Sequence, residues 1–136
     1  MKRLFVLAIA LLLISALTFT SVLAARDPFL GAWVSTDVDG SFQTLTIGGG
    51  PENTYMVRYY DFGASGCGLD PETNEILYTA SAQGFLPSSG EILEGLMPVY
   101  CNTHPPTYIN DLYFYFAYDA STDTITDFSG IVWNRR

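Results

Sequence analysis

The chain has 136 residues, with fourteen acidic side chains against six basic ones and a formal net charge of −8. A field of this sign repels nucleic acid and anionic membrane surfaces, so the partners it favours are cations and basic proteins. The length suits a single domain with its own core, and no segment shows a sustained helical period.

Residues 1–25 have the features of a secretory signal peptide. Lys2 and Arg3 form a short basic segment, residues 4–17 are apolar, and small residues up to Ala25 offer a cleavage site. An uncleaved membrane anchor is the alternative, because about 20 apolar residues span a bilayer; the polar residues 18–21 favour cleavage. Cleavage leaves one domain, residues 26–136, with four arginines against fourteen acids, a formal charge of −10. We expect this domain to be secreted or extracytoplasmic, in a periplasm or at a cell surface, without membrane contact.

The first structural element is a predicted β-hairpin between Gly31 and Ile47. Two runs rich in β-branched and aromatic residues, 31–37 and 40–48, flank Asp39-Gly40. This pair is able to take the positive φ angles of a tight hairpin turn. In the second run, Gln43, Leu45 and Ile47 alternate with residues of the opposite face, as expected of a strand.

Six further strands are expected after this hairpin. Turn chemistry separates them at 48–53, 63–75, 84–90 and 102–110, each rich in Gly, Pro or Asn. Pro98 lies inside one candidate strand and predicts an edge, a bulge or a shorter strand there. The expected strands are 54–62, 75–83, 91–100, 111–119, 123–128 and 130–135.

Eight strands at this spacing predict an all-β fold, either a small antiparallel up-and-down barrel or a β-sandwich. Short sequential connections favour the barrel. In such a meander all odd-numbered strands finish at one end, so Cys67 and Cys101, which follow the third and fifth strands, should meet there. An even cysteine count in an exported chain predicts a disulfide between them. Metal ligation or reactive thiols are the alternative, but no Cys-x-x-Cys spacing supports it.

Gly31-Ala32-Trp33, at the start of the first expected strand, resembles the Gly-x-Trp that opens lipocalin and avidin-like (calycin) barrels. In lipocalins an arginine late in the chain packs over this tryptophan, and Arg135 or Arg136 is placed to do so. The resemblance implies a lipocalin-like barrel with a small apolar ligand. It also implies that Trp33 is buried at a closed end of the barrel.

No catalytic motif accompanies these features. His104 is the only histidine, and no nucleophile or metal motif surrounds it, which argues against an enzyme and against a bound cofactor or metal. Asp37-Val38-Asp39-Gly40 resembles the opening of a calcium loop, but Gly48 stands where an EF-hand has its twelfth-position Glu. A hairpin turn is the simpler interpretation, and a looser calcium site with Asp61 or Asp70 is the alternative.

Binding is therefore the expected function. Long loops on a rigid scaffold concentrate binding residues, so we expect the site at the disulfide end, in loops 63–75 and 102–110. Carboxylates beside aromatic rings suit a small apolar, hydroxylated or cationic ligand. A carbohydrate, a protein, a protease-inhibitor-like role or a surface structural role are the alternatives, with tyrosines such as Tyr113 and Tyr115 on the outer wall. The expected ligand-binding residues are Asp61, Asp70, Tyr100, His104 and Tyr108.

Overall fold

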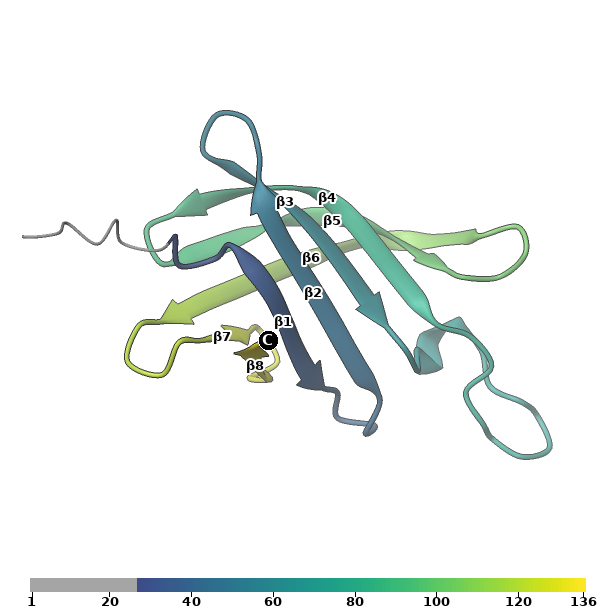
Figure 1. The fold of residues 1–136 in the computed structure, drawn as a ribbon. Coiled ribbons are helices and arrows are strands. Elements are labelled where there is room, and N and C mark those ends of the chain that lie inside the picture. The colour runs from purple at the N-terminus through teal and green to yellow at the C-terminus, as the bar shows by residue number, and fades with distance from the viewer. Residues whose placement is uncertain (1–26) are drawn as a thin grey trace, which may run out of the picture.

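A computed structural model describes residues 27–136, and the expected signal peptide lies outside them. Each strand pairs antiparallel with its sequence neighbours, and β1 also pairs with β8, so the sheet closes into a barrel (Figure 1). The all-β, up-and-down barrel prediction is confirmed, and the architecture is compatible with a calycin-like fold. The strands are β1 (Gly31–Thr36), β2 (Phe42–Gly49), β3 (Thr54–Asp61), β4 (Ala80–Ser89), β5 (Ile92–Cys101), β6 (Thr107–Asp119), β7 (Thr124–Asp127) and β8 (Val132–Arg135).

One side of each strand faces the barrel interior because side chains alternate along a strand. The interior is filled at its centre: Trp33, Leu45, Phe116 and Trp133 are each at most 2% exposed. Leu86, Leu93 and Met97 from β4 and β5 complete the same core. In residues 27–136 no helix is long and apolar enough to cross a membrane.

The two ends of the barrel differ. The end at which the odd-numbered strands finish carries the segments 37–41, 62–79, 102–106 and 128–131. We call it the disulfide end. The opposite end carries the short turns after β2, β4 and β6 together with both chain ends of the described region, and we call it the closed end.

Trp33 lies at the closed end, as the calycin resemblance implied. Its indole Nε1 donates a hydrogen bond to the carbonyl of Phe29 at 2.9 Å, and both residues are fully buried. The Arg135 guanidinium stacks over the Trp33 ring at 4.0 Å from its centroid. Arg135 also donates to the carbonyls of Leu30 and Pro28 and forms an ion pair with Asp123. Arg135, rather than Arg136, is therefore the arginine over Trp33.

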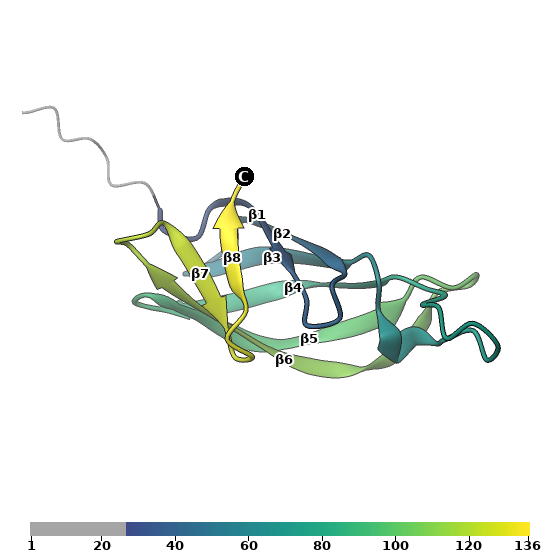
Figure 2. The same cartoon turned by 90° about the horizontal axis from the view of Figure 1, so that it is seen from below.

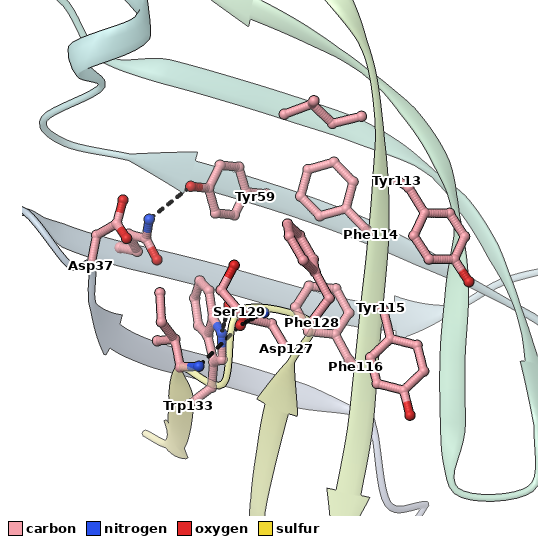
Figure 3. A pocket seen from close by; sticks show the side chains of 13 residues that line it. Asp37, Tyr59, Tyr113, Phe114, Tyr115, Phe116, Asp127, Phe128, Ser129 and Trp133 are labelled. Atoms are coloured by element: carbon pink, nitrogen blue, oxygen red, sulfur yellow. Dashed lines mark hydrogen bonds between the residues drawn. The ribbon is translucent and has the colours of Figure 1, made fainter.

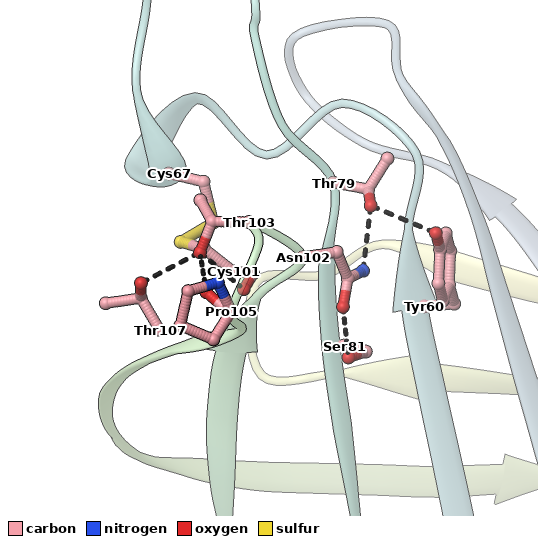
Figure 4. The surroundings of a disulfide bond; sticks show 9 residues. All are labelled: Tyr60, Cys67, Thr79, Ser81, Cys101, Asn102, Thr103, Pro105 and Thr107. Carbon is pink, nitrogen blue, oxygen red and sulfur yellow. Dashed lines mark hydrogen bonds between the residues drawn. A yellow bond between two sulfur atoms is a disulfide. The ribbon is translucent and has the colours of Figure 1, made fainter.

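The disulfide bond between Cys67 and Cys101 is present, and the prediction of this bridge is confirmed. Cys67 lies in a single 3₁₀ turn, η1 (Ser65–Cys67), within the long loop after β3. Cys101 ends β5. The bridge therefore attaches this loop to the rim of the barrel (Figure 4). Asn102 adds a second attachment, because it accepts a hydrogen bond from Ser81 and donates one to Thr79.

The prediction of a strand at 75–83 and a loop at 84–90 is wrong. β4 begins at Ala80 and continues through Gly84 and Pro87 to Ser89. Gly84 does not break the strand; a Cβ there would lie 3.0 Å from Cγ of Met97, so glycine makes room for a core side chain. Pro87 pairs with Thr54 of β3, while no β4–β5 pairing spans residues 83–87, so its missing N–H is tolerated.

Two smaller expectations are refined. The first hairpin exists, but its connection spans residues 37–41, and only Gly40 has a positive φ, at 87°. Pro98 does accompany a bulge: Val99 pairs with Asn110 and Tyr100 with Tyr108, so Ile109 of β6 has no counterpart on β5. β6 begins at Thr107, which shortens the expected loop 102–110.

The barrel wall is incomplete at the disulfide end. β6 has 13 residues, whereas β7 and β8 have 4 each. β7 pairs with β6 only at residues 116–119 of β6, and β8 pairs with β1 only at Trp33 and Val34 of β1. β6 consequently continues well past β7 and β8 toward the disulfide end (Figure 2). This mismatch leaves one side of β6 open and exposes the interior there.

Candidate binding site: an aromatic cavity with an acidic rim

A cavity of about 170 Å³ occupies the open part of the wall (Figure 3). β6 forms one side, the turn between β7 and β8 forms another, and the ends of β1 to β3 complete it. The volume is close to that of cavities that hold one benzene-sized ring, and smaller than the roughly 300–1,000 Å³ of drug-sized ligand pockets. Its lining comprises Asp37, Gln43, Tyr59, Leu112, Tyr113, Phe114, Tyr115, Phe116, Asp127, Phe128, Ser129, Ile131 and Trp133.

Aromatic rings form a continuous wall of this cavity. Tyr59 makes edge contacts with Phe114 and Trp133, at centroid distances of 5.4 and 6.1 Å. Phe116 meets Trp133 at 6.1 Å with the ring planes perpendicular. Phe128 stands at the lip and is 72% exposed. Ring faces carry partial negative charge, so this wall attracts apolar groups and cations alike.

A chain of polar groups crosses the inner wall. The hydroxyl of Ser35 donates to the Gln43 amide oxygen at 3.0 Å, and the Gln43 amide nitrogen donates to the Tyr59 hydroxyl at 2.9 Å. Burial, followed by the charges of Asp61 and Asp37, raises the pKa of Tyr59 far above its ordinary value of 10.0. Tyr59 is therefore a neutral hydroxyl, and the Asp61 carboxylate lies within reach of its proton.

Two carboxylates, those of Asp37 and Asp127, line the cavity. Burial raises the pKa of Asp37, and the charges of Asp39, Asp61 and Asp127 raise it further against the opposing hydrogen bond from the Val38 N–H. A raised carboxyl pKa means that the negative charge is poorly compensated. Arg135 and Arg136 lie at the closed end, so they do not neutralise this rim.

Asp127 and Asp61 have structural tasks. Asp127 accepts hydrogen bonds from the backbone of Ser129 and Ile131 and from the Trp133 indole at 3.1 Å, so it fixes both the turn and the ring (Figure 3). Asp61 accepts from the Ser41 hydroxyl and the Gly63 N–H, and it is 7% exposed. Asp37 accepts only the backbone N–H of Val38, and its carboxylate is therefore the most available to a ligand.

The residues expected from the sequence to bind a ligand do not line this cavity. Asp61 is buried in the loop contact just described. Asp70 caps its own turn by accepting the N–H groups of Glu72 and Thr73. His104 is exposed and precedes the cis-proline Pro105 in the loop after β5. These three residues belong to three different local structures at the disulfide end.

Tyr100 and Tyr108 are brought together, but outside the barrel. They face each other across β5 and β6, with ring centroids 5.7 Å apart. Both are substantially exposed, at 39% and 51%. They form one cross-strand pair on the outer wall, on the surface opposite to the cavity lining of β6.

Hydrogen bonds to Ser41 hold the shape of the turn at Asp37 and Asp39. Asp39 accepts the N–H of Ser41 at 2.9 Å, and the Asp37 N–H donates to the Ser41 carbonyl. Within residues 27–136 no group of three His, Cys, Asp or Glu side chains is placed to hold a metal ion.

Sequence patterns do not identify the lining of this cavity. Alternation in 111–118 puts Leu112, Phe114 and Phe116 on one face of a strand, but nothing in that pattern says that the face opens to solvent. One signal is the length of the expected strands, which is 6 residues each for 123–128 and 130–135 against 9 for 111–119. Unequal neighbouring strands leave part of a barrel wall missing.

Comparison with known proteins adds no relative: no family model, no curated protein and no solved structure matches this chain.

Proposed function

We propose that this protein is an exported, non-enzymatic, lipocalin-like barrel that binds a small organic cation in the cavity at its disulfide end. The observation that carries the proposal is a ring-sized cavity that combines an aromatic wall with two carboxylates, of which Asp37 has a raised pKa. Aromatic faces and carboxylates are the two groups that recognise organic ammonium ions. The disulfide and the calycin-like architecture support export and binding, respectively.

The cavity size and chemistry define the ligand class. About 170 Å³ accommodates one aromatic ring or one trimethylammonium group, with any larger part of the ligand outside the mouth. Asp37 supplies the counter-charge, while the Tyr59 hydroxyl supplies a polar contact inside. A hydroxylated ring is the second choice for this site, and an anion is disfavoured by the rim.

The test is calorimetric titration with three probes of similar shape: phenethylammonium, 2-phenylethanol and 3-phenylpropionate. We expect the cation to bind best, the alcohol more weakly and the carboxylate not at all. Equal binding of cation and carboxylate would contradict the role of the rim. Ala substitution of Tyr100, His104 and Tyr108 together should leave the affinity unchanged; loss of binding in that variant would place the site in the loops instead.

Removing the ring at the lip should weaken binding without affecting the fold. Phe128→Ala removes one aromatic face from the cavity, and we expect the affinity for phenethylammonium to fall by about tenfold. Because Phe128 is 72% exposed, the melting temperature should change little. Phe85→Ala is the matched control, since Phe85 is 50% exposed on β4 and does not line the cavity. If Phe128→Ala and Phe85→Ala change the affinity for phenethylammonium equally, Phe128 does not form part of the binding cavity.

The pH dependence of binding should report Asp37. Its pKa is raised above 3.8, so on acidification its carboxylate is neutralised at a higher pH than an ordinary aspartate. Cation affinity should be full when Asp37 is ionised and fall as the pH drops through that raised pKa. In Asp37→Asn the affinity at neutral pH should be lower by about fivefold, and the fall with pH should be flattened. An unchanged pH profile in this variant would show that another group supplies the charge.

A further inference from the structure

The open side of β6 has a second property besides access to the cavity: it is an unpaired sheet edge. β5 pairs with β6 along its whole length, whereas β7 stops at Asp127, opposite Phe116. After Asp127 the chain turns away through Phe128, and nothing in the described region pairs with the β7 side of residues 107–115. An edge of this kind presents backbone donors and acceptors that a further strand is able to use.

Alternation along β6 identifies the residues whose backbone faces this edge. The N–H of Tyr118 donates to the carbonyl of Glu91, so the backbone groups of Tyr118 point toward the β5 side. Backbone direction reverses at each residue in an antiparallel strand. Between Tyr118 and the bulge at Ile109, the residues that point away from β5 therefore include Tyr115, Tyr113 and Asp111.

A strand added at this edge would continue the line of β7 and complete the barrel wall. Its inward side chains would meet the cavity, because the adjacent β6 residues Leu112, Phe114 and Phe116 line it. Its outward side chains would lie beside Tyr113, which is 49% exposed, and Tyr115; in Figure 3 both rings lie on the other side of the β6 ribbon from Phe114. The backbone edge and the side-chain cavity thus form one continuous surface.

Charge indicates what occupies this surface. Asp111 lies on the edge itself, Glu94 accepts a hydrogen bond from the Tyr113 hydroxyl beside it, and Asp37 and Asp127 lie at the cavity. Residues 27–136 contain fourteen acidic side chains and three arginines, so two copies of the chain repel each other. A basic strand meets the negative charges of Asp111 and Glu94 at this edge, whereas a second copy meets like charge.

We infer that β6 residues 111–115 bind an extended basic peptide by β-strand addition, with one cationic side chain of the peptide inserted into the aromatic cavity. This inference rests on the proposed function for the chemistry of the cavity and adds a partner class to it. Backbone hydrogen bonds supply affinity in this mode of recognition, and the pocket for an alternate side chain supplies selectivity.

The experiment uses a hexapeptide of alternating Lys and Val with blocked ends, its Glu-for-Lys counterpart, and phenethylammonium as the cavity probe. Tyr113→Pro removes the edge N–H, while Tyr113→Ala loses the same side chain and keeps the N–H; proline is compatible with this position because its N–H faces no strand. We expect the Lys peptide to lose about tenfold in affinity for Tyr113→Pro and less than about threefold for Tyr113→Ala. The Glu peptide should not bind, and phenethylammonium should bind Tyr113→Pro and Tyr113→Ala equally, because both variants lose the same lining side chain. Tyr115→Pro and Tyr115→Ala provide the same comparison if Tyr113→Pro does not fold.

Each alternative result has a defined meaning. Equal peptide affinity for the Pro and Ala variants would overturn strand addition. Binding of phenethylammonium without binding of the Lys peptide would overturn this inference and leave the proposed function standing. Peptide binding that depends on the Tyr113 N–H, without phenethylammonium binding, would support the edge and refute the small-cation function. A dimer that dissociates in Tyr113→Pro would make a second copy the occupant and overturn the basic peptide.

Discussion

Replacing Trp33 with alanine should lower the free energy of unfolding by about 3–5 kcal/mol. Trp33 is fully buried, and its indole N–H bonds the Phe29 carbonyl. The substitution leaves a cavity beneath the Arg135 guanidinium, which loses the ring over which it stacks at 4.0 Å. Because Arg135 also holds the backbone of Pro28 and Leu30, the closed end should loosen as a unit. Chemical denaturation with matched m-values is the measurement.

Leu96→Ala is the control for this experiment. Leu96 is also a large apolar residue, but it is 65% exposed on β5, so its truncation should change stability by less than about 0.5 kcal/mol. If Trp33→Ala is as stable as Leu96→Ala, the closed end does not depend on this tryptophan. The assignment of Gly31-Ala32-Trp33 as the anchor of the barrel would then be wrong.

Loss of the Cys67–Cys101 bridge should lower stability by about 4 kcal/mol, the chain-entropy value for a loop of this length. The bridge spans 34 residues and secures the long loop after β3 to the end of β5. We expect the paired Cys67→Ala and Cys101→Ala variant to unfold at lower denaturant concentration than the parent. Binding of phenethylammonium under native conditions should persist, because neither cysteine lines the cavity.

Thiol titration and reduction complete this test. The unfolded, unreduced protein should contain no titratable thiol, and two thiols would refute the bridge. Reduction of the parent should reproduce the stability of the double alanine variant, which separates the effect of the cross-link from that of the side chains. A double variant with parental stability would show that the loop is held by contacts such as those of Asn102 alone.

The filled centre and the open wall together explain why this barrel suits a small group better than a large one. Trp33, Leu45 and Trp133 occupy the interior that a larger barrel would leave for a ligand. The remaining space is confined to the zone where β7 and β8 end, beside β6. In the proposed function, a ligand would enter from the side of the disulfide end and contact the edge of β6.

Sequence patterns correctly placed the residues whose position follows from strand alternation or from the order of the strands. Alternation in 111–118 puts Phe114 and Phe116 on the same face of a strand, and in the structure both are buried. The meander also placed Cys67 and Cys101 at one end, where the bridge forms. The β4 region was wrong because Gly84 and Pro87 have the composition of a loop, whereas Met97 and the absent β5 pairing make them compatible with a strand.

The sequence by itself determined most of the strand pattern and the disulfide, because alternation, turn residues and cysteine count act over short distances or through simple topology. Tertiary structure alone decided which aromatic residues line a cavity. Phe114, Phe128 and Trp133 come from three separate elements, and they share a cavity only because β7 and β8 end before β6 does. It also decided that Asp61 is committed to Ser41 and Gly63 while Asp37 remains available, since hydrogen-bond partners distant in the chain are set by packing.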